Sequence, residues 1–218
     1  MIDIQNCKAK GYRDFDISYT LMRGNCDTKR LAILLPGAEY SIEKPLFHYI
    51  TSVYINSNID VLHIKYCYDQ EHFNAKTKED LLKALKHDVN TVITIVLKQY
   101  NYESFQLISK SLGTIALSSL ISKKEFKTAK LIWLTPLLKN DEVFLTMRNC
   151  SHRSLSIIGN VDPNYNEKRF NLVKENQNMI AKLITGTNQS LERSDNIIES
   201  LNILKKIMIE ITKFIDED

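Results

Sequence analysis

The sequence has few cysteines, and their spacing excludes two common classes of protein. The four cysteines, Cys7, Cys26, Cys67 and Cys150, lie far apart and form no Cys-x-x-Cys pair. Isolated cysteines of this kind predict neither a disulfide framework nor a zinc site. We therefore expect reduced thiols, no metal and no cofactor, and we interpret Cys67 as a small buried apolar residue.

The sequence also lacks a long apolar run and a strong charge of either sign. No run approaches the length of a membrane span, and residues 1–6 have no basic segment that leads into an apolar one. The formal net charge of +3 is small and evenly spread, which gives no argument for nucleic-acid binding. The basic stretch at residues 123–127 is typical of a solvated helix end. These absences predict a cytoplasmic protein that binds neither membranes nor nucleic acids.

Proline and glycine are scarce as well, with 4 and 6 residues among 218. No stretch rich in Pro, Gly or Ser interrupts the chain, so we expect residues 1–218 to form a single domain. Hydrophobic residues make up 44% of the chain and charged residues 25%, which is ordinary for a globular protein with one sizeable core. The composition leaves the oligomeric state open.

What the sequence does contain is a regular alternation of apolar runs and amphipathic stretches. Two alternating stretches before Arg23, separated by Gly11, predict an antiparallel hairpin at a sheet edge. From Leu31 onward, strands alternate with helices, which predicts an α/β fold: a three-layer α/β/α sandwich with a mostly parallel sheet. Strands are expected at residues 31–35, 60–66, 105–108, 130–136, 154–159 and 179–184, and helices at residues 42–52, from 77 onward, at 114–120, 141–147, 164–174 and from 194 to the C-terminus.

Residues 105–120 carry the clearest chemical signal. A run that predicts a strand meets Ser-Lys-Ser-Leu-Gly at residues 109–113 and passes directly into a run that predicts a buried helix. A serine on such a sharp turn stands clear of the sheet, and the amide of the next residue, Leu112, is placed to stabilise an oxyanion. Small residues are needed two positions to either side, and Ser109 stands where glycine is favoured. This pattern marks Ser111 as a candidate nucleophile.

The order of the remaining motifs resembles the α/β-hydrolase fold superfamily, in particular its small, lidless esterase and dienelactone-hydrolase-like members, over nearly the whole chain. In that superfamily nucleophile, acid and histidine follow one another along the chain, each at the carboxyl end of a strand. The resemblance assigns Ser111 as nucleophile and Asp162, after the strand at 154–159, as acid. It also implies that the loop after the strand at 31–35 supplies the second oxyanion amide, from Ala38 or Glu39.

A glutamine occupies the position where this resemblance places the histidine. The superfamily carries a turn like Gly-x-x-His-Ser-Leu after the last strand, whereas residues 186–191 read Gly-Thr-Asn-Gln-Ser-Leu. The amide of Gln189 has no basic lone pair near neutral pH, so it is able to hydrogen-bond Ser111 but not to take its proton. The triad is incomplete as written, and a conventional fast esterase is not expected.

The five histidines of the chain lie before this position. His63, within a strand, and His87, on a helix, are predicted to be structural. His152 precedes the acid strand and is expected at the far edge of the sheet. His72 is on a polar loop after a strand end and so at the correct edge, whereas His48 follows the oxyanion loop on a helix that is expected to carry it away from Ser111. These two histidines remain the alternative bases.

Three functional hypotheses follow from these residues. The first is a serine hydrolase of the esterase type that acts on a small acyl substrate, with Ser111 as nucleophile and Asp162 as orienting acid. The second is a catalytically inactive homologue that binds a small molecule or has a regulatory role, for which Gln189 is the motivation. A third is an altered chemistry in which water or a substrate group is the base. Lys110, beside the serine, is interpreted as a solvent-facing side chain rather than a base.

Overall fold

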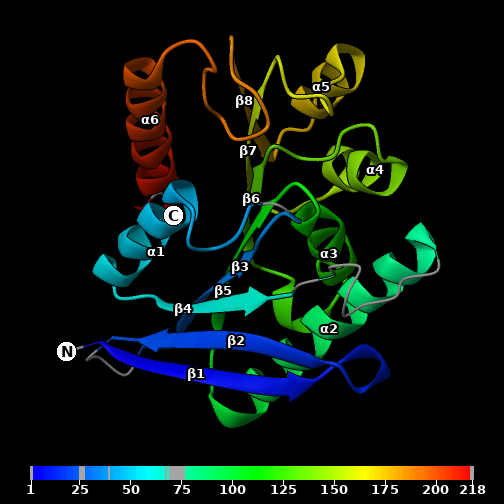
Figure 1. The fold of residues 1–218 in the computed structure, drawn as a ribbon, viewed down its shortest axis with the longest axis vertical. Helices are drawn as coiled ribbons and strands as arrows, with labels where there is room; N and C mark the ends of the chain where they lie inside the picture. The colour runs from blue at the N-terminus through cyan, green and yellow to red at the C-terminus, as the bar shows by residue number, and fades with distance from the viewer. Residues whose placement is uncertain (1, 25–27, 39, 67, 69–76, 217–218) are drawn as a thin grey trace.

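The computed structural model describes residues 2–24, 28–38, 40–66, 68 and 77–216, and it has an eight-stranded sheet at its centre (Figure 1). The strands lie in the order β1-β2-β4-β3-β5-β6-β7-β8. The β1–β2 and β2–β4 pairs are antiparallel, and every other pair is parallel. The strands are β1 (Asp3–Lys10), β2 (Asp16–Arg23), β3 (Arg30–Leu35), β4 (Asp60–Lys65), β5 (Ser104–Lys110), β6 (Lys130–Leu134), β7 (Ser154–Gly159) and β8 (Met179–Ile184).

Helices cover both faces of this sheet, which confirms the predicted three-layer sandwich with its N-terminal hairpin. In Figure 1, α1 and α6 lie on one side of the sheet, and α2, α3, α4 and α5 lie on the other. The helices are α1 (Pro45–Asn56), α2 (Lys78–Gln99), α3 (Gly113–Leu120), α4 (Asp141–Asn149), α5 (Glu167–Lys174) and α6 (Ile197–Asp216), with 3₁₀ turns at Tyr12–Asp14 and Lys124–Phe126. Within the described part of the chain, no helix is long and apolar enough to cross a membrane.

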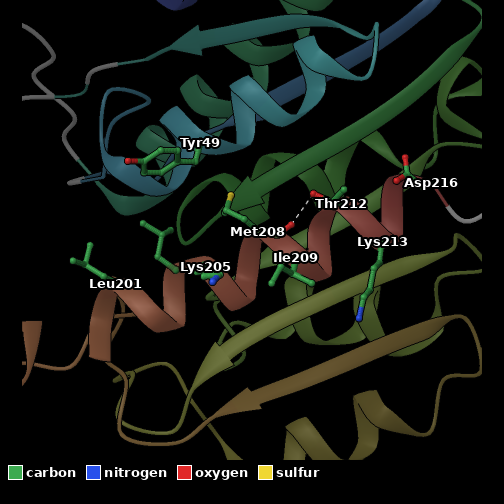
Figure 2. Close-up of a pocket in the computed structure, with 9 residues that line it drawn as sticks. Tyr49, Leu201, Lys205, Met208, Ile209, Thr212, Lys213 and Asp216 are labelled. Atoms are coloured by element: carbon green, nitrogen blue, oxygen red, sulfur yellow. Dashed lines mark hydrogen bonds between the residues drawn. The ribbon is translucent and has the colours of Figure 1, made fainter. Parts of the chain in front are cut away.

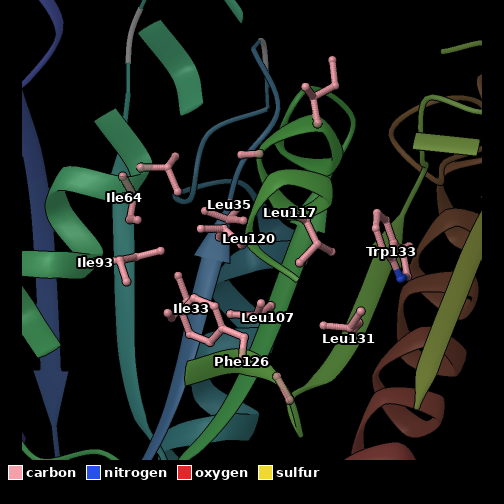
Figure 3. Close-up of a cluster of buried hydrophobic side chains, with 14 of the residues drawn as sticks. Ile33, Leu35, Ile64, Ile93, Leu107, Leu117, Leu120, Phe126, Leu131 and Trp133 are labelled. Carbon is pink, nitrogen blue, oxygen red and sulfur yellow. The ribbon is translucent and has the colours of Figure 1, made fainter. Parts of the chain in front are cut away.

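Two hydrophobic clusters fill the spaces between the layers. Successive side chains of a strand point to opposite faces, so Ile33 and Leu35 of β3 join the cluster under α2 and α3, whereas Ala32 and Leu34 join the one under α1 and α6. Figure 3 shows the first cluster, in which Trp133 lies at the β6 side. This is the physical reason for the continuous apolar runs in the sequence, because a strand covered on both faces has no solvent side. Trp133 belongs to this core, since its side chain has no exposed surface.

Local signals account for most helix boundaries. Thr77 caps α2 by accepting a hydrogen bond from the Asp80 amide at 3.1 Å, and the helix begins where the sequence predicts it. The helix expected at residues 42–52 begins instead at Pro45, whose fixed φ and missing N–H suit the first helical turn. The helix expected from residue 164 begins at Glu167, because Asn166 is its capping residue and accepts from the Arg169 amide at 3.0 Å.

The parallel strands place their carboxyl ends along one edge of the sheet. The loop after β3, the turn after β5 at Ser111 and the loops after β6, β7 and β8 therefore start from the same edge. Residues 135–140 form the whole connection between β6 and α4, so no lid is inserted there, in agreement with the lidless proteins that the sequence resembles. This edge brings together side chains that lie far apart in the sequence.

Candidate active site

Ser111 lies on a strained turn between β5 and α3. Its φ of 49° is in the left-handed region, which non-glycine residues adopt only when the surrounding structure holds them there, at a cost of about 1–3 kcal/mol. The Ser111 amide donates to the Leu134 carbonyl at 3.1 Å, and the Thr114 hydroxyl donates to the Ser111 carbonyl at 2.6 Å. A Cβ at Gly113 would lie 2.1 Å from the Leu35 carbonyl oxygen, so only glycine fits where α3 begins. The sheet itself therefore holds the serine in this conformation.

The serine two residues before Ser111 is accommodated without a glycine. Ser109 is completely buried, and its hydroxyl donates to the Ile132 carbonyl of the neighbouring strand at 3.2 Å. A small side chain with a satisfied hydroxyl fits this position between β5 and β6. The departure from glycine that the sequence shows is therefore harmless to the turn.

Gln189 contacts Ser111 directly. Its Nε2 donates to the Ser111 Oγ at 2.7 Å. The turn that carries Gln189 is closed by the Asn188 amide, which donates to the Glu192 carbonyl at 3.0 Å, and it is tied to the loop after β7 by the Val161 amide, which donates to the Thr187 carbonyl at 3.0 Å. The structure thus brings together two residues that are separated by most of the C-terminal half of the chain.

Asp162 lies beneath this turn but makes no hydrogen bond to Gln189. Its side chain is 4% exposed, and Oδ1 accepts from the Asn164 amide at 2.7 Å. Oδ2 is buried and has no hydrogen-bond partner among the residues that the structure describes. Burial raises the pKa of this carboxyl above its usual range, against the opposing effects of the Asn164 hydrogen bonds and of the positive charge on Lys110.

Lys110 is buried, and its predicted solvent-facing position is wrong. Its side chain is only 1% exposed, and Nζ donates to the Thr135 hydroxyl at 2.8 Å and to the Gln189 backbone carbonyl at 2.5 Å. Nζ also lies 4.5 Å from the centre of the Tyr40 ring. Burial lowers the pKa of Lys110 to about 8, although the negative charges of Asp162 and Glu192 act to raise it.

The strand position of Lys110 explains this burial. It is the last residue of β5, a strand with neighbours on both sides, so its side chain runs along the sheet edge under the loops after β3, β6 and β8. In the sequence, the available signal for the burial of Lys110 was its position as a charged residue at the end of a buried strand. Thr135 and Tyr40, which enclose the ammonium group, carried no comparable signal, because only the fold brings their loops together.

A polar pocket of about 320 Å³ opens beside Ser111. Gly37 lies close to the serine, since a Cβ added there would be 3.3 Å from the Ser111 Cβ. The Tyr66 hydroxyl donates to the Pro36 carbonyl and so anchors the loop at its start. The amides of Ala38 and Leu112 have no hydrogen-bond acceptor within the described part of the chain, whereas Glu39 lies outside the described residues. The pocket is lined by Gly37, Ala38, Tyr40, Lys110, Ser111, Gln189 and Ser190.

Of the described histidines, none lines this pocket. His63 is buried, and its Nε2 lies 2.7 Å from the Thr51 hydroxyl oxygen. Burial lowers the pKa of His63 to about 4. His152 Nε2 lies 3.0 Å from the Phe126 carbonyl oxygen, and His87 is half-exposed beside Asp88. His48 is exposed on α1. His72 and Cys67 lie outside the described residues.

A larger groove of about 540 Å³ lies between α1 and α6 (Figure 2). Its lining is mostly apolar, with Tyr49 on α1 facing Leu201 and Met208 on α6. The Thr212 hydroxyl in this groove donates to the Met208 carbonyl at 2.9 Å and is therefore engaged within its own helix. The groove brings no nucleophile and partner together, whereas the Ser111 pocket places Gln189 Nε2 2.7 Å from Ser111 Oγ and is therefore the candidate active site. Among the described residues, no cluster of His, Cys, Asp and Glu is placed to bind a metal ion.

Comparison with known proteins identifies the fold but not a sequence family. No protein-family model and no curated protein match the sequence. Solved structures do match. An esterase from Pyrococcus furiosus has a TM-score of 0.75 at 10% identity, over 98% of this chain and 91% of that one. An α/β serine hydrolase homologue from Coxiella burnetii has a TM-score of 0.73 at 9% identity, over 96% of both chains. A serine hydrolase without a lid from Xanthomonas campestris has a TM-score of 0.68 at 13% identity, over 97% of this chain and 91% of that one. The chain therefore has the α/β-hydrolase fold.

Proposed function

We propose that this protein is a serine hydrolase of the esterase type that acts on a small acyl substrate. The observation that carries the proposal is the strained turn at Ser111, whose φ of 49° is held by the sheet while its hydroxyl faces a pocket. Strain of this kind is kept at functional sites more often than elsewhere, because it holds a reactive group in place. The esterases and serine hydrolases that share the fold support the same reaction class.

In this proposal Ser111 attacks the acyl carbon and the backbone amides stabilise the oxyanion. The amides of Leu112 and Ala38, or that of Glu39 in place of Ala38, stabilise the charge that develops on the carbonyl oxygen in this scheme. Asp162 is the acid of the triad, and Gln189 takes the position of its histidine. The pocket volume of about 320 Å³ lies at the lower end of the range for small-molecule sites, which favours short acyl groups.

The missing base sets the expected rate. Gln189 donates a hydrogen bond to Ser111 and has no group that takes up a proton at neutral pH. Removing the base alone from a serine protease lowers turnover by about 10⁶, while the oxyanion hole and binding still give about 10³–10⁴ over water. We therefore expect slow acylation of Ser111 rather than fast ester turnover.

One observation favours the alternative, a catalytically inactive homologue that binds a small molecule. The Gln189 Nε2 donates to Ser111 Oγ at 2.7 Å, which engages one of the two lone pairs of the oxygen that would attack a carbonyl carbon. A site arranged in this way is able to bind a ligand through the serine hydroxyl and the free amides without reacting with it. The two functions differ in whether Ser111 forms a covalent bond.

Labelling with a fluorophosphonate probe separates these functions. We expect the probe to modify Ser111, with the adduct located by peptide mass spectrometry, and Ser111→Ala to abolish the label. p-Nitrophenyl esters of increasing acyl length then define the substrate range, with the shortest chains turned over fastest. A protein that takes no label and hydrolyses none of these esters would instead be the inactive homologue.

A further inference from the structure

Lys110 is a buried titratable group in the Ser111 pocket that the scheme above leaves without a role. It lines the same pocket as Ser111 and Gln189, and its side chain is 1% exposed. Lysine is rarely buried so completely, because desolvation of an ammonium ion costs several kcal/mol unless the group is paired. A buried amine beside a serine that lacks a base therefore calls for a chemical explanation. The inference below rests on the proposed function.

The contacts of Lys110 suit a neutral amine as well as an ammonium ion. Nζ has two hydrogen-bond acceptors, the Thr135 hydroxyl at 2.8 Å and the Gln189 carbonyl at 2.5 Å. A neutral amine has two N–H bonds, which satisfy these two acceptors, and one lone pair, which remains free to accept a proton. The Tyr40 ring, 4.5 Å from Nζ, covers another side of the group.

Thr135 holds this arrangement in place. It is completely buried and has a φ of 43°, a strained conformation for a β-branched residue. Its amide donates to the Ile157 carbonyl at 2.7 Å, so the end of β6 is fixed against β7 while the hydroxyl meets Lys110. The strain and the contact with Nζ occur at the same residue, as expected where the surrounding structure over-determines a functional position.

We propose that Lys110, in its neutral form, receives the proton of Ser111 across one water molecule in the pocket when Ser111 attacks the acyl carbon. Lys110 and Ser111 make no direct hydrogen bond in the structure, whereas general bases act across a single water as well as by direct contact. Lys110 would then supply the function that Gln189 lacks. It acts on Ser111 through water, and Gln189 positions both groups, one through its side chain and the other through its backbone carbonyl.

Proton transfer and bond formation at Ser111 occur together in this step. The Ser111 Oγ–H proton passes to the water, and a proton of that water passes to the Nζ lone pair. The Oγ electron pair forms the bond to the acyl carbon, and the π electrons of the carbonyl move to the oxygen that the Leu112 amide faces. When the tetrahedral intermediate collapses, the bond to the leaving alkoxide breaks, and the Lys110 ammonium returns its proton to that alkoxide.

The surrounding charges set the pH at which Lys110 is neutral. Burial lowers the pKa of Lys110 to about 8, and the carboxylates of Asp162, after β7, and Glu192, after β8, oppose that shift. The loop after β3 contributes the Tyr40 ring, and the end of β6 contributes the Thr135 hydroxyl. About half of the Lys110 side chains would therefore be neutral at pH 8, and nearly all at pH 9.5.

The test is the rate at which a fluorophosphonate modifies Ser111 between pH 6.5 and 10. We expect the wild-type rate to rise with a midpoint near pH 8. Lys110→Arg keeps the charge and the donors but does not deprotonate, so it should lower the rate at pH 9 by about 10²-fold or more and remove the midpoint. Lys110→Met, which also removes the charge, should likewise lower the rate at pH 9 and remove the midpoint. Thermal unfolding of each variant monitors the fold.

Thr135→Val tests the proposal with less disturbance, since valine has nearly the shape of threonine. Loss of the hydroxyl removes an acceptor that stabilises the ammonium form, so the midpoint should move to lower pH. If the Lys110 variants fail to fold, the labelling midpoint of Thr135→Val is the deciding measurement. A midpoint equal to that of the wild type overturns the proposal. Labelling of the Lys110 variants at the wild-type rate and pH dependence also overturns it, while leaving Ser111 a nucleophile. A wild-type protein that takes no label at any pH overturns the proposed function as well.

Discussion

The two walls of the Ser111 pocket are held by different parts of the polypeptide. We call the turn at 111–113 with the loop after β3 the serine wall, and the turn at 186–192 with Lys110 the partner wall. Backbone packing fixes the serine wall, because Gly113 lies against the Leu35 carbonyl and the Ser111 amide donates a hydrogen bond to the Leu134 carbonyl. Side chains build the partner wall, through Gln189 and Lys110. A single substitution is therefore able to change the chemistry of the partner wall, whereas a change in the serine wall disturbs the sheet.

Gln189→His should have the largest effect, and it acts on the partner wall alone. A histidine there would place a base beside Ser111 Oγ, and the unpartnered Oδ2 of Asp162 is available as its orienting acceptor. We expect kcat/KM for p-nitrophenyl acetate to rise by about 10²–10⁴-fold, the usual contribution of general-base catalysis. Gln189→Asn is the matched control, since it alters the side chain without adding a base. No gain in the histidine variant would show that the partner wall differs from a working triad by more than one residue, or that Lys110 already supplies the base.

Gly113→Ala should break the serine wall. The new Cβ would meet the Leu35 carbonyl oxygen at 2.1 Å, and backbone atoms have little freedom to move away. We expect a loss of about 3 kcal/mol in the free energy of unfolding, at the upper end of overpacking effects, and loss of fluorophosphonate labelling. Gly24→Ala is the control, because a Cβ at that position meets nothing within 4 Å. Equal stability of the two variants in urea would contradict the close contact.

His63 tests whether a histidine of this chain already has a structural role instead of a catalytic one. Burial lowers its pKa from 6.5 to about 4 in the folded state, so the unfolded chain binds a proton more readily. Stability should therefore be lost as the pH falls from about 6.5 to 4, by about 3 kcal/mol from this residue. Urea unfolding of His63→Gln should show a weaker decline over this range than the wild type. His87→Gln, at a half-exposed position, is the matched control for the substitution itself, and neither variant should alter Ser111 labelling.

Ser111→Gly should have the smallest effect, and it measures the strain stored in the serine wall. Glycine adopts the φ of 49° without steric cost, whereas alanine does not. Both variants lose the hydroxyl and the hydrogen bond from Gln189, so their difference isolates the backbone term. We expect Ser111→Gly to be more stable than Ser111→Ala by about 1 kcal/mol in thermal or urea unfolding. Equal stabilities would mean that the turn relaxes once the hydroxyl is absent.

The sequence by itself determined the layers of this protein and the location of the serine turn. Hydrophobic periodicity and helix capping depend on residues that are close in sequence. The strands from β3 to β8 and the start of α2 were therefore predictable from neighbouring residues alone. The Ser-x-Ser-x-Gly pattern was equally readable, because the steric need for Gly113 arises within one strand-to-helix turn and the strand beside it. Errors at the starts of α1 and α5 amount to about three residues and follow from the positions of Pro45 and Asn166.

Only the tertiary structure decided the electrostatics of the pocket. Lys110 is one of many charged residues in the sequence, and its burial depends on three loops that converge over the end of β5. The unpartnered oxygen of Asp162 and the contact of Thr135 with Nζ are likewise set by which strand ends meet at the sheet edge. Burial and charge pairing depend on neighbours that are distant in sequence, so periodicity and motif spacing do not report them. The serine wall was readable from the chain, and the partner wall required the fold.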